Sequence, residues 1–223
     1  MKRPVVTIDG PAGSGKSTTA KLVARRLGYT YLDTGAMYRA MALKALELGI
    51  DAADADALGR MALGTSIRVE PDPEGTRVIL DGRDVTGLLR SPEVSRNASP
   101  VSAARLVRER MVAIQREIGR AGGVVAEGRD IGSVVFPDAE VKIYLDADLR
   151  SRAARRKRDL EAAGREAALE DVERDLSARD ERDSTRQHSP LCVPEGSIRV
   201  DTTDLTIDEQ VERVVAAVRG KAG

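Results

Sequence analysis

The sequence predicts an α/β fold in which about five parallel strands form one sheet flanked by helices. Short runs rich in β-branched residues alternate along the chain with longer segments whose apolar residues recur at helical spacing. A glycine-rich loop joins the first such run to the first helical segment. One segment breaks the alternation, because several short strand-like runs follow one another in it. The alternating part indicates a parallel sheet covered on both faces, and the broken part indicates a small antiparallel insertion.

Five β-rich runs are the candidate strands of the sheet: residues 5–8, 30–33, 123–127, 141–146 and 197–201. Four segments are candidate helices on its faces: residues 16–27, 35–48, 102–120 and 207–219. Gly28 and Gly49 are stop signals for the first two helices. Ser99-Pro100 is typical of the start of a helix and predicts where the third begins. A capping-box pattern at Thr206 and Glu209 predicts the start of the last.

The stretch GPAGSGKST, residues 10–18, fits the phosphate-loop pattern G-x-x-x-x-G-K-[ST]. Glycines allow the backbone to curl so that successive N–H groups point at oxyanions. A β-rich run precedes the loop and a helix follows it, so the helix N-terminus adds its own attraction for anions. This arrangement predicts a site for a nucleoside triphosphate within a phosphate-loop NTPase-type sheet.

We assign ATP to the whole loop, which comprises Gly10, Pro11, Ala12, Gly13, Ser14, Gly15, Lys16, Ser17 and Thr18. Lys16 places a charge at the β- and γ-phosphates, and we expect it to be an exposed loop charge rather than part of the core. Ser17 is a candidate ligand of Mg²⁺. Asp33, at the end of the second predicted strand, is a second candidate, either directly or through a water molecule.

Residues 66–85 predict three short antiparallel strands, separated by a PDPEG turn and by a tight Asp81-Gly82 hairpin turn. They lie within residues 61–99, which we treat as a module inserted into a single domain of residues 1–223. A decorative insertion is one interpretation. A module opposite a phosphate loop often covers an acceptor, and we favour that role.

The stretch LRSRAARRKRDLEAAG, residues 149–164, carries six basic residues between Arg150 and Arg158 without one acidic residue. A solvated helix face would explain this composition. The stretch directly follows the fourth predicted strand, however, where a phosphate-transferring enzyme closes its site. We therefore interpret residues 149–166 as a mobile lid, with Arg155 and Arg158 as its candidate contacts to ATP.

Composition excludes several other classes of protein. The chain of 223 residues has 36 basic and 36 acidic residues, so bulk attraction to nucleic acid or to a membrane surface is not indicated. The single Phe, four Tyr and absent Trp leave few rings on which single-stranded bases could stack. The lone Cys192 excludes an internal disulfide, and the lone His188 is expected in a surface loop. Asp9 interrupts the apolar run at the N-terminus, and no run approaches membrane-spanning length, so we expect a cytoplasmic protein.

Three clusters of polar residues lie at the predicted edges of the core, and each could be merely structural. They comprise Asp33, Thr34 and Arg39; Arg129 and Asp130 in the stretch AEGRDIG; and Arg179, Asp183 and Arg186, which share one helical face. Together they offer Arg39, Arg129 and Arg186 as planar clamps for a second phosphate group. No convincing general base accompanies them. A phosphate monoester fits this absence, because it is mostly dianionic at neutral pH and can attack the γ-phosphorus without a base once the repulsion between the two anions is cancelled.

The sequence resembles the bacterial cytidylate (CMP) kinase family. The resemblance rests on the phosphate loop, LDTGAMYR, the β-rich insertion, NAS at residues 97–99, GRDIGSVVFPDA, KIYLDA and the RD-ERD-STR helix. It extends from about Val5 to the last helix, and GRDIGSVVFPDA is far more specific than a phosphate loop. It implies a core that binds ATP and Mg²⁺, a lid, and an insertion that binds the nucleoside monophosphate.

The resemblance also implies roles for individual residues. Those beside or on the CMP phosphate are Thr34, Arg39, Arg129 and Arg186. Those that recognise cytosine are Ser99, Arg108 and Asp130. Those near the sugar are Arg179 and Asp183. Lys16, Arg129 and Arg186 are then the catalytic residues, and Glu127, where an Asp can occur, receives no role.

The expected reaction is phosphoryl transfer from ATP to CMP, and to dCMP, by a monomer. A kinase for UMP, AMP or dTMP is the nearest alternative. A GTPase-like switch is a more distant one, because the D-x-x-G string at residues 84–87 lies inside the insertion, and N-K-x-D is absent.

Overall fold

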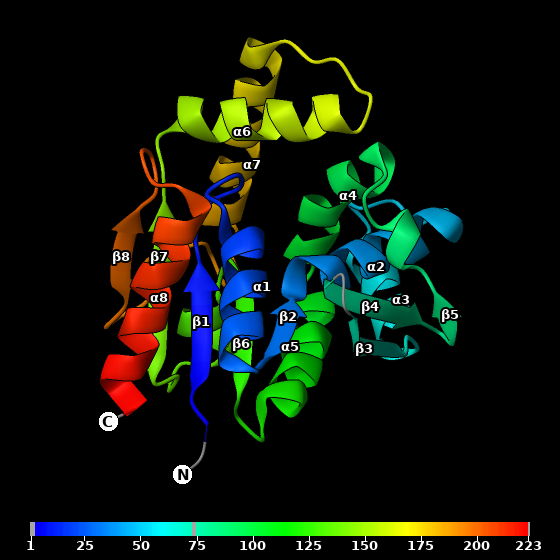
Figure 1. Cartoon of the computed structure of the whole chain (residues 1–223). Helices are drawn as coiled ribbons and strands as arrows, with labels where there is room; N and C mark the ends of the chain where they lie inside the picture. Colours follow the sequence, from blue (N-terminus) through cyan, green and yellow to red (C-terminus); the bar gives the residue numbers. More distant parts are fainter. Residues whose placement is uncertain (1–2, 73–74, 223) are drawn as a thin grey trace.

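The computed structural model describes residues 3–72 and 75–222 and contains the expected parallel sheet (Figure 1). Its order is β2-β6-β1-β7-β8, and each neighbouring pair is parallel. The strands are β1 (Val5–Asp9), β2 (Thr30–Asp33), β6 (Val124–Gly128), β7 (Val141–Asp146) and β8 (Ile198–Asp201). Because all five point the same way, the segments that follow them meet at one edge of the sheet. The predicted fold class is confirmed.

Helices cover both faces of the sheet, as the alternation of elements predicts. Successive residues of β1 show the division, since Val6 and Ile8 belong to one apolar cluster and Val5 belongs to another. The first cluster packs under α1 (Lys16–Leu27) and α8 (Ile207–Ala222). The second packs under α2 (Thr34–Glu47) and α5 (Arg105–Gly119). Val, Ile, Leu, Met and Ala fill most of both clusters, as the scarcity of aromatic residues requires.

The insertion contains the predicted antiparallel sheet, in the order β3-β4-β5. Residues 61–99 contain β3 (Ile67–Asp72), β4 (Gly75–Leu80), β5 (Arg83–Asp84) and the short η1 (Thr86–Leu88), and they overlap α3 (Ala55–Leu63) and α4 (Pro92–Ala103) at either end. Asp81 and Gly82 both have positive φ angles, 48° and 86°, as a tight hairpin turn requires. Pro73 and Glu74 of the predicted PDPEG turn lie outside the described residues. The D-x-x-G string falls on β5 and η1, away from the sheet that carries the phosphate loop.

The predicted start of a helix at Ser99-Pro100 is wrong. Pro100 lies inside α4, which continues to Ala103, and the chain turns only at Ala104, whose ψ angle is 123°. A proline fits the first turn of a helix best, but within a helix it removes one hydrogen bond without ending the element. Helix α4 was therefore not predicted, and neither was α3, which begins where the Asp54 carboxylate accepts from the N–H of Ala57 at 2.8 Å.

Two helices, α6 (Leu149–Ala162) and α7 (Leu169–Thr185), form an arm above the edge where the strands end (Figure 1). Val172 and Leu176 of α7 pack against Ala153 of α6 in a small apolar cluster of their own, which also contains Ala12 of the phosphate loop. The arm contains the predicted lid. Within the described part of the chain, no helix is both long and apolar enough to cross a membrane.

The capping box predicted before α8 is present. The N–H of Thr206 donates to the Glu209 carboxylate at 2.8 Å, and the N–H of Glu209 donates back to Thr206 Oγ1 at 3.3 Å. We predict that Thr206→Ala lowers the free energy of unfolding by about 1 kcal/mol, because α8 loses one cap and the helix covers one face of the sheet. Chemical denaturation measures this change. Thr206→Ser keeps the hydroxyl and serves as the control, so an equal loss in both variants would contradict the prediction.

Candidate functional site

The phosphate loop leaves β1 at Gly10 and enters α1 at Lys16. Gly10 has a φ of 149°, and a Cβ atom there would lie 2.0 Å from the carbonyl oxygen of Leu145 on β7. Gly13 and Gly15 also have positive φ angles, 79° and 92°. Only glycine accommodates this close approach and these angles, so the backbone curls as the motif predicts.

Lys16 is not the exposed loop charge that we expected. It is the first residue of α1 and is only 5% exposed, because the loop folds over its side chain. Its Nζ atom donates to the carbonyl oxygen of Pro11 at 2.6 Å and to Ser14 Oγ at 3.3 Å. Burial, and next the nearby charge of Arg129, lower the pKa of Lys16. An anion in the loop therefore gains a partner that is already held in place.

Ser17 lies beside a carboxylate to which the sequence analysis assigned no role. Its Oγ atom donates to Glu127 Oε1, at the end of β6, at 2.6 Å. The hydroxyl of Tyr31 donates to the same oxygen at 3.4 Å. Burial, and then the charge of Asp33, raise the pKa of Glu127. The described residues contain no group of three or more His, Cys, Asp and Glu that could hold a metal by themselves.

Asp33, Thr34 and Arg39 lie together where β2 passes into α2. The Asp33 carboxylate caps α2 by accepting from the N–H of Ala36 at 2.7 Å, and it also pairs with Arg39 at 2.9 Å. Thr34 Oγ1 is buried and donates to the carbonyl oxygen of Glu127 at 2.7 Å. The cluster predicted from the sequence is thus anchored to the end of β6.

Three of the predicted arginines converge on Asp183 of α7. Arg129 Nε donates to Asp183 Oδ2 at 3.0 Å, and Arg179 and Arg186 lie within 3.9 Å of its carboxylate oxygens. Burial alone would raise the pKa of Asp183, but these guanidinium groups hold that pKa below its ordinary value. Burial, and next Arg129, lower the pKa of Arg179 to about 10. The cluster is short of negative charge, which favours an anionic ligand.

Asp130 forms a second carboxylate centre beside the first. It makes a fully buried ion pair with Arg108 of α5, and its other oxygen lies 3.5 Å from Arg186. The guanidinium of Arg108 also lies over the ring of Tyr38, 5.1 Å from its centroid. Ser99 of α4 donates to Asp183 at 3.1 Å, so the base and sugar candidates form one network with Arg129 and Arg186, whereas Thr34 and Arg39 bond to the ends of β6 and β2 instead.

The arginines of α6 differ from one another in their exposure and in their hydrogen-bond partners. Arg155 donates to both Oγ1 and the carbonyl oxygen of Thr202 and to the carbonyl oxygen of Thr203, whereas Arg158 is exposed. The sequence analysis did not single out Arg152, which is buried and donates to the carbonyl oxygen of Ala12 at 2.9 Å. Arg152 also pairs with Asp180 of α7, which accepts from the N–H of Ala12 at 3.1 Å. The arm therefore holds the phosphate loop through backbone atoms, a contact that no local pattern signals.

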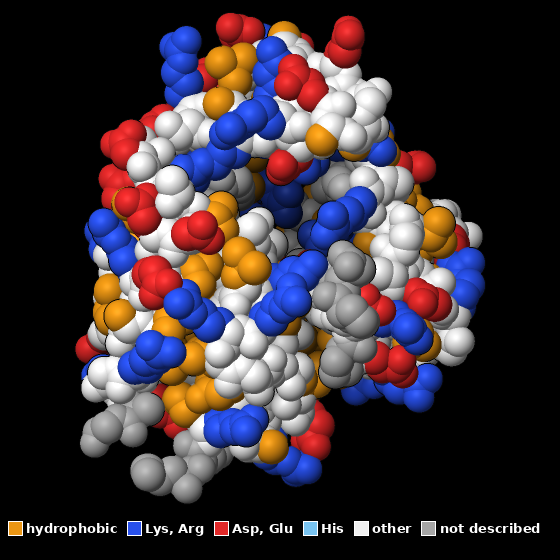
Figure 2. Space-filling model, in the orientation of Figure 1, with side chains coloured by type: hydrophobic (Ala, Val, Ile, Leu, Met, Phe, Trp, Pro, Cys, Tyr) orange, Lys and Arg blue, Asp and Glu red, His pale blue; other side chains and the backbone are white. Residues whose placement is uncertain are grey.

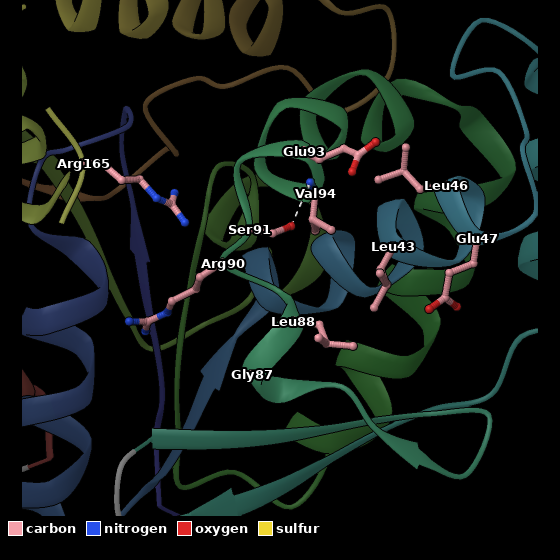
Figure 3. A pocket seen from close by; sticks show the side chains of 10 residues that line it. All are labelled: Leu43, Leu46, Glu47, Gly87, Leu88, Arg90, Ser91, Glu93, Val94 and Arg165. Atoms are coloured by element: carbon pink, nitrogen blue, oxygen red, sulfur yellow. Dashed lines mark hydrogen bonds between the residues drawn. The ribbon is translucent and has the colours of Figure 1, made fainter. Parts of the chain in front are cut away.

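Figure 2 shows a hollow beneath the arm, with Lys and Arg side chains on its floor and rim. A separate groove of about 540 Å³ lies between the insertion and the connection from α6 to α7 (Figure 3). Leu43, Leu46 and Leu88 supply much of its apolar lining, and the side chain of Arg90 extends away from these leucines. None of its lining residues is a predicted site residue, so this groove does not mark the predicted nucleotide site.

Comparisons with known proteins agree with this geometry. A family model described as "Cytidylate kinase" matches residues 6–220. The chain is 52% identical over 217 residues to a cytidylate kinase of Symbiobacterium thermophilum, with 96% of each chain covered. It is 45% identical over 224 residues to a cytidylate kinase of Geobacillus kaustophilus, with 100% of each covered. A solved gluconokinase from Sinorhizobium meliloti 1021 shares the fold alone, with a TM-score of 0.52, 14% identity, and coverage of 98% of this chain and 93% of the other.

The family model spans nearly the whole chain, and the relatives match it from end to end at high identity. The chain therefore belongs to the cytidylate kinase family.

Proposed function

We propose that the protein transfers the γ-phosphoryl group of ATP to CMP, and also to dCMP, giving ADP and CDP or dCDP. The observation that carries this proposal is the convergence of Arg129, Arg179 and Arg186 on Asp183, beside the phosphate loop. Both Arg129 and Arg179 are close enough to Lys16 to lower its pKa. Two phosphate groups can therefore share one basic pocket, with the donor on the loop and the acceptor on the arginines.

The proposed reaction needs no general base. An oxygen of the acceptor phosphate attacks the γ-phosphorus of ATP, the bond from that phosphorus to the bridging β-oxygen breaks, and ADP leaves with those electrons. The main barrier is the repulsion between two anions, which Lys16, Arg129 and Arg186 offset by charge and by fixed orientation. Guanidinium groups suit this role because they stay charged and bind two oxygens at once.

Mg²⁺ fits the residues around Ser17. Ser17 Oγ and Glu127 Oε1 lie 2.6 Å apart, and Asp33 is near enough to raise the pKa of Glu127. Mg²⁺ usually binds one or two protein groups and completes its coordination shell with phosphate oxygens and water. Ser17 would hold the ion, with Glu127 and Asp33 in contact directly or through water. When bound, Mg²⁺ neutralises charge on the phosphate chain of the donor.

Asp130 and Arg108 are proposed to select the base. Cytosine presents an N4 amino donor beside the N3 and O2 acceptors, which match a carboxylate and a guanidinium. Uracil presents an O4 acceptor instead, and two acceptors would then face each other in a buried site. Asp183, near Arg179, is proposed to accept from sugar hydroxyls, and Ser99 is proposed to contact the base.

A panel of monophosphates tests the proposed function. ATP consumption is measured with CMP, dCMP, UMP, AMP and dTMP, and with no acceptor. We expect CMP and dCMP to be phosphorylated best. Equal turnover with UMP, or ATP hydrolysis that needs no acceptor, would contradict the proposal and favour another kinase or a nucleotide switch.

We predict that Asp130→Asn lowers CMP phosphorylation and shrinks the CMP-to-UMP ratio of kcat/KM. The amide can turn a donor toward O4 of uracil, and the lost discrimination is worth roughly 1–3 kcal/mol, or about 5- to 150-fold. The measurement is that ratio for wild type and variant under the same ATP and Mg²⁺. Asp56→Asn, the same change at an exposed residue of α3, is the control. A preserved ratio would show that cytosine is recognised elsewhere.

We predict that Arg186→Lys lowers kcat/KM for every acceptor alike, on the order of 10- to 100-fold. The lysine keeps the charge but loses the planar pair of donors that a phosphate accepts. Steady-state kinetics with CMP, dCMP and UMP measure the effect. A loss confined to one base would instead assign Arg186 to base recognition.

We predict that ATP binding takes up protons at mildly alkaline pH. Burial and the nearby Arg129 lower the pKa of Lys16, so part of Lys16 is neutral in the free protein. The triphosphate raises that pKa, and the lysine therefore gains a proton as ATP binds. Calorimetry in two buffers of different ionisation enthalpy measures the uptake. Lys16→Arg stays charged throughout, so equal uptake in wild type and variant would contradict the prediction.

A further inference from the structure

Asp9 is the one charged residue of β1, a strand that is buried along its whole length. It is the last residue of β1, its side chain is completely buried, and the sequence analysis singled it out only because it interrupts an apolar run. Burying a carboxylate is costly unless its oxygens find donors. The contacts of the Asp9 carboxylate should therefore explain why a charged group is buried at the end of β1.

Both oxygens of Asp9 accept hydrogen bonds from the backbone of one short segment. Oδ1 accepts from the N–H of Ile131 and Oδ2 accepts from the N–H of Gly132, each at 2.7 Å. These N–H groups begin the single π-helical turn Ile131–Val135, where no partner within the turn is available to them. Two adjacent N–H groups need two acceptor atoms side by side, which a carboxylate supplies and an amide does not.

The joint between Asp9 and this turn is closely packed. A Cβ atom on Gly132 would lie 2.8 Å from Thr7 Oγ1, 3.1 Å from Pro194 and 3.2 Å from Asp9 Oδ2. Thr7 and Asp9 lie two residues apart on β1 and so face the same side of the sheet. The turn is therefore packed closely against β1 at Gly132.

The residues immediately before this turn are the ones that face the acceptor site. Arg129 donates to Asp183, and Asp130 pairs with Arg108 and lies near Arg186. Their backbone is fixed on one side by β6, which ends at Gly128, and on the other by the two hydrogen bonds to Asp9. A small rotation at Ile131 would move the Asp130 carboxylate away from its partners.

We propose that Asp9 is a positioning residue for the acceptor: its carboxylate fixes the Ile131–Gly132 backbone and thereby aims Arg129 and Asp130 at the phosphate and base of the nucleoside monophosphate. The inference rests on the proposed function. It also explains the close link between donor and acceptor, because Asp9 directly precedes Gly10 of the phosphate loop. The strand that presents ATP thus also orients the segment that binds the acceptor.

The test compares Asp9→Asn with Thr7→Val. The asparagine keeps the shape of the side chain but turns an amide donor toward one of the two N–H groups. The valine alters the neighbouring side chain of the same joint, where Thr7 Oγ1 is buried without a hydrogen-bond partner in the described structure. We expect Asp9→Asn to lower kcat/KM for CMP by at least about 10-fold and to shrink the CMP-to-UMP ratio. We expect KM for ATP to stay within about twofold, and Thr7→Val to behave like wild type.

Amide hydrogen exchange in the wild-type protein gives a readout that does not depend on any variant folding. We expect the amides of Ile131 and Gly132 to be protected, and in Asp9→Asn we expect at least one of them to exchange faster while the amides of β1 stay protected. Fast exchange of both amides in wild type would overturn the inference. So would equal changes in KM for ATP and CMP, or a preserved CMP-to-UMP ratio in a folded Asp9→Asn. A wild type that does not phosphorylate CMP would overturn the proposed function instead.

Discussion

Three arginines approach the carboxylate of Asp183, and the geometry of the whole candidate site depends on this convergence. Arg129 follows β6 while Asp183, Arg179 and Arg186 belong to α7 and its end, so the pairing joins the sheet to the arm. Ser99 adds a bond from α4 of the insertion. Burial, and next the charge of Arg129, lower the pKa of Arg179, and the Asp183 carboxylate supplies the negative charge that offsets both costs.

The parallel sheet explains why these charges meet at all. Asp9, Asp33 and Gly128 end three neighbouring strands, and the phosphate loop, α2 and the Arg129–Asp130 segment start from those ends. In such folds, ligands bind beyond the carboxyl ends of the parallel strands, because loops from several strands meet there. The arm contacts the phosphate loop from the side of β7, through the hydrogen bonds of Arg152 and Asp180 with Ala12.

Sequence patterns predicted the parts of this structure that depend on residues close together in the chain. The phosphate loop, the five strands, the Asp81-Gly82 turn and the cap at Thr206 each depend on residues a few positions apart. Glu127 and Asp9 were missed because their partners, Ser17 and Ile131, lie 110 and 122 residues away in the sequence. Burial of Lys16 was missed for a related reason, since the exposure of a loop residue depends on how the loop folds over it. The resemblance to a family added Ser99 and Arg108 as candidate acceptor residues, which no spacing had singled out for that role.

The proposed selectivity for cytosine depends on which contacts the two carboxylate oxygens of Asp130 already make. A carboxylate offers about four lone-pair positions. One oxygen of Asp130 pairs with Arg108, and the other lies 3.5 Å from Arg186, a weak contact that leaves it free to accept again. An amino group on the base can use that remaining capacity, so the ion pairs need not break for cytosine to bind. A base with an acceptor at the same position would have to face the carboxylate directly, and the fixed Arg108 prevents Asp130 from turning away. The ion pairs of Asp130 with Arg108 and Arg186 would therefore also make the site selective.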